Sequence, residues 1–182
     1  GMSSRYADTY AAWRSEPERF WAEAAAAVDW IRAPVCISAA DLGPYGRWFP
    51  DALCNTCHNA VDRHVDAGRG DVTAILYDSP MTGLQRRISY ADLLEEVRTL
   101  GAVLQGYGVE RGDRVVIYMP MSIEGIVAML ACARIGATHS VVFGGFSAQS
   151  LRDRIEDTGA VLVVTADEQQ RGVQAMAPPV RL

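Results

Sequence analysis

Two cysteines and a histidine in the first third of the chain have a spacing that can bind a cofactor. The stretch CNTCHNAVDRH contains Cys54, Cys57 and His58 in the C-x-x-C-H pattern of c-type haem attachment. Covalent haem attachment requires export to an oxidising compartment, and residues 1–21 are polar and lack the apolar core of a signal peptide. A zinc site would need a second, suitably spaced pair of ligands, which the sequence lacks. We therefore expect neither haem nor a metal ion at this motif.

A second pattern, FGGFS at 143–147, has the residue types of a loop that holds an anion. Gly144 and Gly145 have no Cβ, so the backbone there can approach a ligand closely or take a positive φ. Ser147 can then begin a helix, whose N-terminus favours negative charge. The alternative is a tight turn between a strand and a helix, with no ligand. Neither a G-x-G-x-x-G fingerprint nor a Gly-Lys-Ser/Thr phosphate loop occurs in the sequence.

The remaining polar residues give weaker signals. Arg171 lies beyond the last expected strand and could meet a phosphate, although an isolated Arg is more often solvated. His64 and His139 stand singly in apolar surroundings, which favours packed over catalytic histidines. Asp62 and Arg63 are adjacent and are expected to form a surface pair. Because no Ser/His/Asp or Cys/His set can be assembled, we expect no catalytic residue in this chain.

The elements that position these residues begin with helices and extended segments. A helix is expected over 4–13, followed by a second with Ser15 as its N-cap and Pro17 in its first turn. Residues 32–50 carry three prolines and two glycines and are expected to be extended, with the pair Trp48–Phe49 anchoring them on the core.

The C-x-x-C-H motif lies in segment 51–68, which we expect to be one helix. Asp51 can cap this helix and Gly68 can end it. On such a helix Cys54 and Cys57 are one turn apart, and both are expected to be small buried residues. Apolar residues at spacings of three and four form its buried stripe: Leu53, Cys57, Ala60, Val61, His64 and Val65.

From residue 71 onward the sequence alternates between strands and helices. The expected strands are 71–78, 86–90, 113–120, 137–144 and 160–167, the first two forming a hairpin. The expected helices, 90–108, 123–136 and 148–159, follow the N-cap residues Ser89, Ser122 and Ser147. This alternation predicts a mainly parallel sheet with right-handed crossovers. Ligands bind such sheets outside the carboxyl ends of strands, where FGGFS and Arg171 lie.

The fold class is therefore α/β, with three parts along the chain. A helical and extended N-terminal cap region at 1–70 precedes a β/α portion at 71–168 and an irregular tail at 169–182. The 17 Lys and Arg residues never cluster beyond the pair Arg86–Arg87, and the net charge is −5, so we expect no nucleic-acid partner. No apolar run approaches the roughly 20 residues that cross a bilayer, so we expect no membrane partner. These features predict a cytoplasmic protein with reduced cysteines.

The order of these motifs resembles the N-terminal part of the short-chain acyl-CoA synthetases, the acetyl- and propionyl-CoA synthetases of the adenylate-forming superfamily. The resemblance extends to about residue 168, and details such as LCNTCHNAVDRHV favour the propionyl type. Four stretches carry it: PERFWAEAAAAVDW, the Trp48–Phe49 pair before LCNTCHNAVDRHV, the long stretch from RISYADLL to RIEDTGA, and VVTAD.

The resemblance implies an incomplete portion of the adenylate-forming N-terminal domain and a reaction in two steps. A carboxylate attacks the α-phosphate of ATP, with Mg²⁺ offsetting the phosphate charge, and the thiol of coenzyme A then displaces AMP. The resemblance places Gly144 and Gly145 on the coenzyme A side and matches Arg171 to a position that contacts the coenzyme A nucleotide. Gln174 stands where the family usually has a further basic residue. The segment before DRH is a structural helix in this family, so the resemblance also implies no haem.

Several parts of the family pattern are missing from the sequence. These are the Ser/Thr/Gly-rich phosphate loop ending in Lys, the aromatic-x-Thr-Glu motif, the ribose-binding Asp and the catalytic Lys. We therefore expect an N-terminal fragment that does not adenylate by itself. The alternative is a stand-alone coenzyme A-binding or regulatory module. An incomplete sheet leaves an open edge, so we expect a homo-dimer or other self-association.

Overall fold

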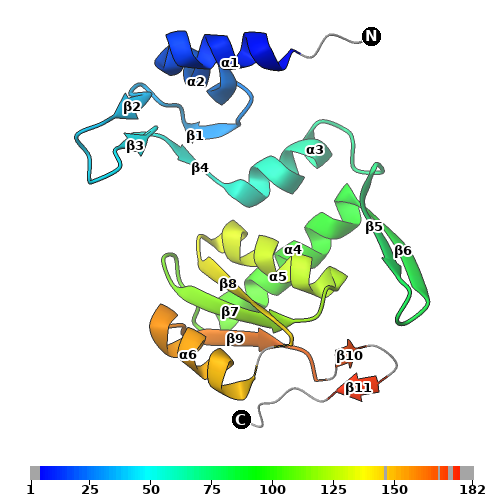
Figure 1. Ribbon diagram of the computed structural model, residues 1–182. Coiled ribbons are helices and arrows are strands. Elements are labelled where there is room, and N and C mark those ends of the chain that lie inside the picture. The colour runs from blue at the N-terminus through cyan, green and yellow to red at the C-terminus, as the bar shows by residue number, and fades with distance from the viewer. Residues whose placement is uncertain (1–4, 146, 168, 172–173, 177–182) are drawn as a thin grey trace. The chain divides into compact units, whose positions relative to one another are not determined.

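The computed structural model describes residues 5–145, 147–167, 169–171 and 174–176. The chain forms two compact units, Gly1–Asn55 and Thr56–Leu182 (Figure 1). This division comes earlier than the boundary near residue 70 that the sequence suggested. The reason is that the helical segment from residue 56 packs on the β/α portion, where its buried residues Cys57 and Val61 join the core.

Within residues 5–55, the first unit contains two helices and two small antiparallel sheets. Helices α1 (Tyr6–Ser15) and α2 (Pro17–Ala25) precede β1 (Trp30–Arg32), which pairs with β4 (Leu53–Cys54), while β2 (Ser38–Ala39) pairs with β3 (Arg47–Trp48). Pro17 occupies the first turn of α2, as expected. Ser15 is not its N-cap: it is the last residue of α1, and its hydroxyl donates to the carbonyl of Ala12 at 3.3 Å.

Aromatic contacts and one carboxylate hold the extended segment of this unit. The ring of Trp48 lies 5.7 Å from that of Trp21, and the ring of Phe49 lies 5.7 Å from that of Trp30. Asp51 accepts hydrogen bonds from the backbone N–H groups of Val35 and Cys36 at 3.0 and 3.2 Å. The N–H of Val35 is the main cause of the lowered pKa of the Asp51 carboxyl.

The expected single helix over 51–68 is wrong in its first part. Leu53 and Cys54 form β4, and Cys54 is exposed rather than buried, because the chain is still paired with β1 there. Helix begins at Thr56, continues as a π-helix over His58–Asp62 and ends as α3 (Arg63–Asp66). Gly68 follows with φ 74°, as expected for a residue that ends a helix.

The second unit is a three-stranded parallel sheet with helices on both faces (Figure 1). After the hairpin of β5 (Thr73–Ser79) and β6 (Leu84–Ser89) come α4 (Tyr90–Gly106), β7 (Arg114–Met119), α5 (Ile123–Ile135), β8 (Thr138–Phe143), α6 (Ala148–Thr158) and β9 (Leu162–Thr165). The strand order is β8–β7–β9. The expected α/β class and hairpin are confirmed.

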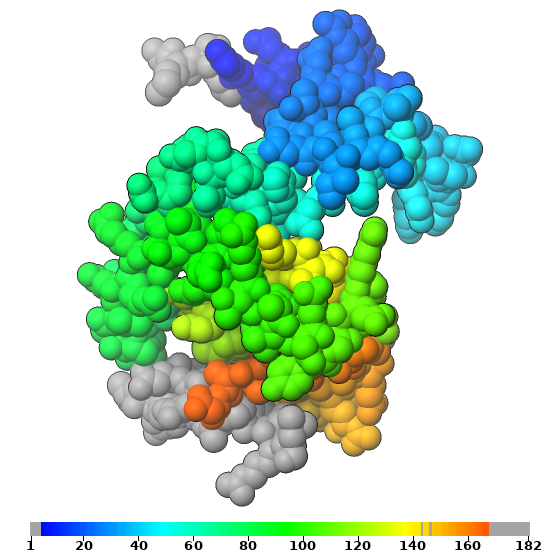
Figure 2. Space-filling view, turned by 180° about the vertical axis from the view of Figure 1, so that it is seen from behind, coloured from blue at the N-terminus to red at the C-terminus, as the bar shows by residue number. Residues whose placement is uncertain are grey.

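Successive residues of β7 point to opposite faces of the sheet and so belong to two cores. Val115 and Ile117 pack with α4, α5 and the helical segment from residue 56. Val116 and Tyr118 pack with Val142 and with residues of α6. Seen from the other side, the surface coloured turquoise to green contains the helical segment from residue 56, the β5–β6 hairpin and α4 (Figure 2). The coverage of both faces accounts for the run of buried residues from Val115 to Tyr118.

The three predicted serine caps of this unit are confirmed. The hydroxyls of Ser89, Ser122 and Ser147 accept hydrogen bonds from the backbone N–H three residues on, at 3.1, 3.3 and 3.2 Å. The tail differs from the irregular segment expected, because β10 (Gln169–Arg171) pairs antiparallel with β11 (Gln174–Met176). Residues 177–182 of the expected tail lie outside the described residues. Of the helices that the structure describes, none is long and apolar enough to cross a membrane.

Candidate functional site

The carboxyl ends of the three parallel strands meet at one edge of the sheet. In the register of the sheet, Tyr118 of β7 is level with Val142 of β8 and with Thr165 of β9. The loop at Gly144–Gly145 therefore begins at the same edge as the segment after β9. This arrangement is the one in which open α/β sheets bind their ligands.

A buried tyrosine contacts the glycine loop. The hydroxyl of Tyr118 donates a hydrogen bond to the carbonyl oxygen of Gly144 at 3.2 Å. The Tyr118 residue is 1% exposed, whereas Gly144 is half-buried and Gly145 is exposed. Sequence reasoning missed Tyr118, although a hydroxyl near the end of an otherwise apolar strand was a usable signal, because a buried phenol usually finds a partner.

Arg171 lies in β10, where its backbone is level with Gln174 of β11. The side chains of both residues lie outside the described part of the structure. Arg171 comes six residues after Thr165, the last residue of β9. Its assignment alongside Gly144 and Gly145 stays a prediction.

A second polar cluster lies between the helical segment from residue 56 and α5. Arg134 donates from Nη1 to both carboxylate oxygens of Asp62, at 2.7 and 2.8 Å. The Sγ of Cys57 lies 3.8 Å from Oδ2 of Asp62 and 3.9 Å from Nη1 of Arg134. The expected surface pair of Asp62 with Arg63 is therefore wrong, because Asp62 is buried and its carboxylate pairs with α5.

The π-helix explains why Asp62 was missed. The backbone N–H of Arg63 donates to the carbonyl of His58, five residues earlier, so this turn is one residue wider than an α-turn. Cys57 and Asp62 are also five residues apart, and their side chains meet. A periodicity of 3.6 residues placed Val61 on the buried stripe and left Asp62 outside it.

The two buried thiols are poor nucleophiles. Burial raises the pKa of Cys132 to about 11. Burial also raises the pKa of Cys57, against the opposing effect of the hydrogen bond from Arg134. Burial lowers the pKa of the Arg134 guanidinium, but the hydrogen bonds to Asp62 and Cys57 outweigh it and the pKa is raised. The cluster is therefore a structural link between two helices, with Arg134 charged.

The structure places the two cysteines of the C-x-x-C-H motif in different elements. Cys54 lies in β4 of the first unit and Cys57 in a helix of the second. The thiol of Cys57 is fully buried against Asp62, whereas a thioether to haem needs a sulfur that the porphyrin can reach. Within the described ranges, no three His, Cys, Asp or Glu residues come together in a way that could hold a metal ion.

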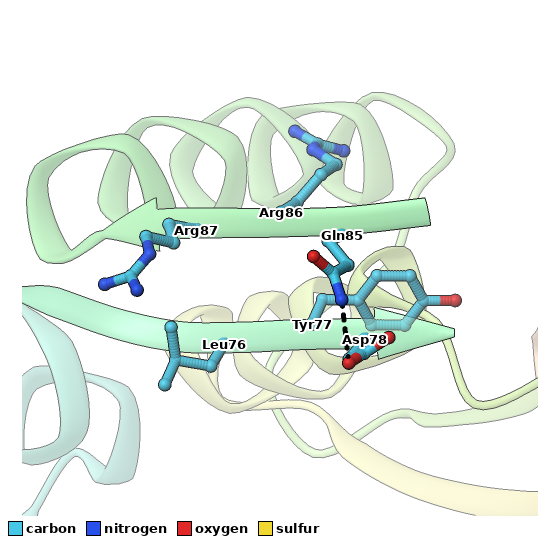
Figure 3. Close-up of a pocket in the computed structure, with 6 residues that line it drawn as sticks. All are labelled: Leu76, Tyr77, Asp78, Gln85, Arg86 and Arg87. Atoms are coloured by element: carbon cyan, nitrogen blue, oxygen red, sulfur yellow. Dashed lines mark hydrogen bonds between the residues drawn. The ribbon is translucent and has the colours of Figure 1, made fainter. Parts of the chain in front are cut away.

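An open groove of about 560 Å³ lies on the β5–β6 hairpin (Figure 3). The amide of Gln85 donates to the carboxylate of Asp78 at 3.1 Å across the two strands. Arg86 and Arg87 point away from one another, because neighbouring residues of a strand face opposite sides. The two guanidinium groups therefore do not converge on one anion.

Comparison with known proteins gives two family matches. Residues 61–181 match the model of the AMP-binding enzymes, and residues 6–60 match the model of the acetyl-coenzyme A synthetase N-terminus. The junction between the two matches lies within the helical segment from residue 56. The resemblance inferred from the sequence motifs is confirmed.

Curated relatives resemble nearly the whole chain. An acetyl-coenzyme A synthetase of Cupriavidus metallidurans is 49% identical over 160 residues, 87% of this chain and 24% of the relative. One of Paraburkholderia phymatum is 47% identical over 174 residues, 93% of this chain and 26% of the relative. The human acyl-CoA synthetase short-chain family member 3, mitochondrial, is 45% identical over 166 residues, 91% of this chain and 24% of the relative.

The chain spans about a quarter of the length of the curated relatives it matches. The AMP-binding model covers well over half of the 182 residues, and its match begins at residue 61, within the π-helix. The acetyl-coenzyme A synthetase N-terminus model matches residues 6–60, so the two matches together extend across both units. The chain therefore belongs to the family of AMP-binding enzymes, with an acetyl-coenzyme A synthetase N-terminus.

Proposed function

We propose that this chain forms the N-terminal part of an acid–thiol ligase that converts acetate or propionate to its coenzyme A thioester. In the first step a carboxylate oxygen attacks the α-phosphorus of ATP and releases pyrophosphate. In the second step the sulfur of coenzyme A attacks the acyl carbon and releases AMP. The relatives named as acetyl-coenzyme A synthetases support this reaction class.

The part assigned to this chain is on the coenzyme A side. The observation that carries this assignment is the exposed Gly145 at the carboxyl edge of the sheet. The carbonyl of the preceding residue, Gly144, accepts a hydrogen bond from the Tyr118 hydroxyl. We assign Gly144, Gly145 and Arg171 to coenzyme A. We assign ATP, Mg²⁺ and the catalytic Lys to a longer protein, since this sequence contains no Lys.

Two further assignments complete the proposal. The compartment is the cytoplasm, where the thiols of the four cysteines, all free in the structure, stay reduced.

The chain by itself forms a homo-dimer through the edge of its sheet, where β8 has one strand neighbour in the described residues and Val141 is 49% exposed. A stand-alone module is less well supported, because the match to synthetases runs across both units.

A chimera tests the assignment. The 160 matched residues of the Cupriavidus metallidurans acetyl-coenzyme A synthetase are replaced by those of this chain. We expect the chimera to retain acetate- or propionate-dependent ATP–pyrophosphate exchange and to release the acyl-CoA. The 182-residue chain alone should show no exchange. A folded chimera that exchanges pyrophosphate but forms no thioester would contradict the coenzyme A assignment.

A further inference from the structure

We propose that Tyr118 is a positioning residue that fixes the orientation of the Gly144–Gly145 peptide, so that the N–H of Gly145 faces the ligand side of the sheet edge. That this N–H binds coenzyme A rests on the proposed function. The positioning itself rests on the contact between the Tyr118 hydroxyl and the Gly144 carbonyl.

The side chain of Tyr118 has little freedom. It comes from the next-to-last residue of β7, and its ring packs with Val116, Val142 and Leu151 in the core between the sheet and α6. The residue is 1% exposed, so its hydroxyl is almost completely shielded from water. A buried hydroxyl without a partner is costly, and the carbonyl of Gly144 at 3.2 Å provides one. The hydrogen bond therefore ties the loop after β8 to the end of β7.

The geometry of the peptide bond carries this constraint to the next residue. The six atoms of a peptide unit are coplanar, and in the trans form the C=O and N–H point in opposite directions. When the carbonyl of Gly144 points to the Tyr118 hydroxyl, the N–H of Gly145 must point away from it. Gly145 is exposed and has no Cβ, so an acceptor can approach this N–H closely.

This places one oriented backbone donor at the carboxyl edge. The acceptors that coenzyme A offers are the phosphate oxygens of its nucleotide and the amide oxygens of its pantetheine arm. Either kind of oxygen can accept a hydrogen bond from the N–H of Gly145. A donor already held in place loses less conformational entropy when the ligand binds.

NMR of the isotopically labelled 182-residue chain tests the positioning without any enzyme activity. In Tyr118→Phe the ring remains and the hydroxyl is lost. We expect the carbonyl ¹³C resonance of Gly144 to shift, and the backbone order parameter of Gly145 to fall below about 0.6, the range of flexible loops. An unchanged carbonyl shift and order parameter would overturn the inference.

Two control variants test whether loss of packing, or loss of any tyrosine hydroxyl, has the same effect. Val115→Ala weakens the core on the other face of β7 and leaves the packing around the Tyr118 ring intact, and Tyr107→Phe removes the hydroxyl of a residue that is 75% exposed. Neither should change Gly145. If Tyr118→Phe does not fold, NMR of the wild-type chain provides the test. The hydroxyl proton of Tyr118 should exchange slowly with water and show a cross-peak to Gly144. The lack of such a resonance overturns the inference.

Titration with coenzyme A then separates this inference from the proposed function. If both hold, coenzyme A shifts the Gly145 amide of the wild-type chain and binds Tyr118→Phe about fivefold more weakly, as expected for one hydrogen bond. If coenzyme A leaves the wild-type spectrum unchanged while Tyr118→Phe still loosens Gly145, the proposed function fails and the positioning stands. Equal affinity of the two proteins contradicts the role of Tyr118 in binding.

Discussion

Asp62 and Arg134 are 72 residues apart in the sequence, and Nη1 of Arg134 lies within 2.8 Å of both carboxylate oxygens of Asp62. Their side chains are 10% and 28% exposed, so the pair is far better shielded from water than the Arg152–Glu156 pair on the surface of α6. This pair joins the helical segment from residue 56 to α5. It is one reason why that segment belongs to the second unit.

Replacement of Asp62 by Ala should destabilise the second unit. The substitution leaves the partly buried guanidinium of Arg134 without its carboxylate, and we expect the free energy of unfolding to fall by about 2 kcal/mol. Urea denaturation followed by circular dichroism measures the change. Glu156→Ala is the matched control, because it removes the carboxylate of an exposed ion pair and should leave the midpoint unchanged. Equal midpoints for Asp62→Ala and the wild-type chain contradict the role given to the pair.

The raised pKa of Cys132 predicts a loss of stability at alkaline pH. An unfolded thiol loses its proton near the ordinary pKa of 9.0, whereas the folded one keeps it up to about pH 11. Between these values the folded state binds more protons than the unfolded state, so stability falls as the pH rises. The contribution is fully present below pH 9 and amounts to about 2–3 kcal/mol.

Urea denaturation at pH 8, 9, 10 and 11 checks this expectation. Cys132→Ala removes the titrating thiol and keeps every tyrosine, and the sequence contains no Lys to titrate in the same range. The decrease in stability should therefore be smaller in Cys132→Ala. Parallel curves for the two proteins would show that Cys132 does not contribute.

Thiol alkylation should distinguish the four cysteines. Cys54 is exposed and Cys36 half-buried, whereas Cys57 and Cys132 are buried with raised pKa values. At pH 8 we expect iodoacetamide to modify Cys54 first and to leave Cys57 and Cys132 intact, because the thiolate is the reactive form. Mass spectrometry of the peptides reports each site, and unfolding in guanidinium should expose all four. Rapid modification of native Cys57 is incompatible with its buried position beside Asp62.

Arg171→Ala tests the nucleotide contact in the chimera described above. We expect the KM for coenzyme A to rise about tenfold, as for the loss of one charged hydrogen bond. ATP–pyrophosphate exchange should be unchanged, because coenzyme A takes no part in that step. Arg152→Ala, from an exposed pair on α6, controls for the loss of one positive charge. A rise in the KM for ATP, with the KM for coenzyme A unchanged, would contradict the assignment of Arg171 to coenzyme A.

Val141→Lys tests the proposed self-association. A lysine on an edge strand discourages pairing with a second strand. We expect light scattering to give a dimer for the wild-type chain and a monomer for Val141→Lys. Val103→Lys places the same charge on α4, where Val103 is 46% exposed, and should leave the dimer intact. A wild-type monomer at high concentration contradicts the proposal.

The parts of the fold that depend on local sequence were predictable. Ser89, Ser122 and Ser147 cap their helices because a serine hydroxyl needs only the N–H three residues ahead. The strands of the parallel sheet were found because residues buried on both faces form continuous apolar runs. Ser15 shows the limit of such reasoning: it belongs to the end of α1, and Glu16 takes the position before α2 without a side-chain cap.

The errors at Cys54 and Asp62 have a different origin. Cys54 is exposed because its segment pairs with β1, a contact between residues far apart in the sequence. Asp62 is buried because the backbone changes from an α-turn to a π-turn, which no periodic pattern predicts. At the candidate site, the glycines were found from their residue type. The contact from Tyr118 depends on the register of two strands and was not found.

The π-turn over His58–Asp62 also connects the number of residues in this turn to the charge that is tolerated at position 134. This turn holds one more residue than an α-turn, so a homologue that lacks one residue here can keep an unbroken helix. In that homologue the residue corresponding to Asp62 would rotate away from α5, and an arginine corresponding to Arg134 would lose its carboxylate. A deletion in this turn and a neutral residue at position 134 are therefore expected to have arisen together in evolution.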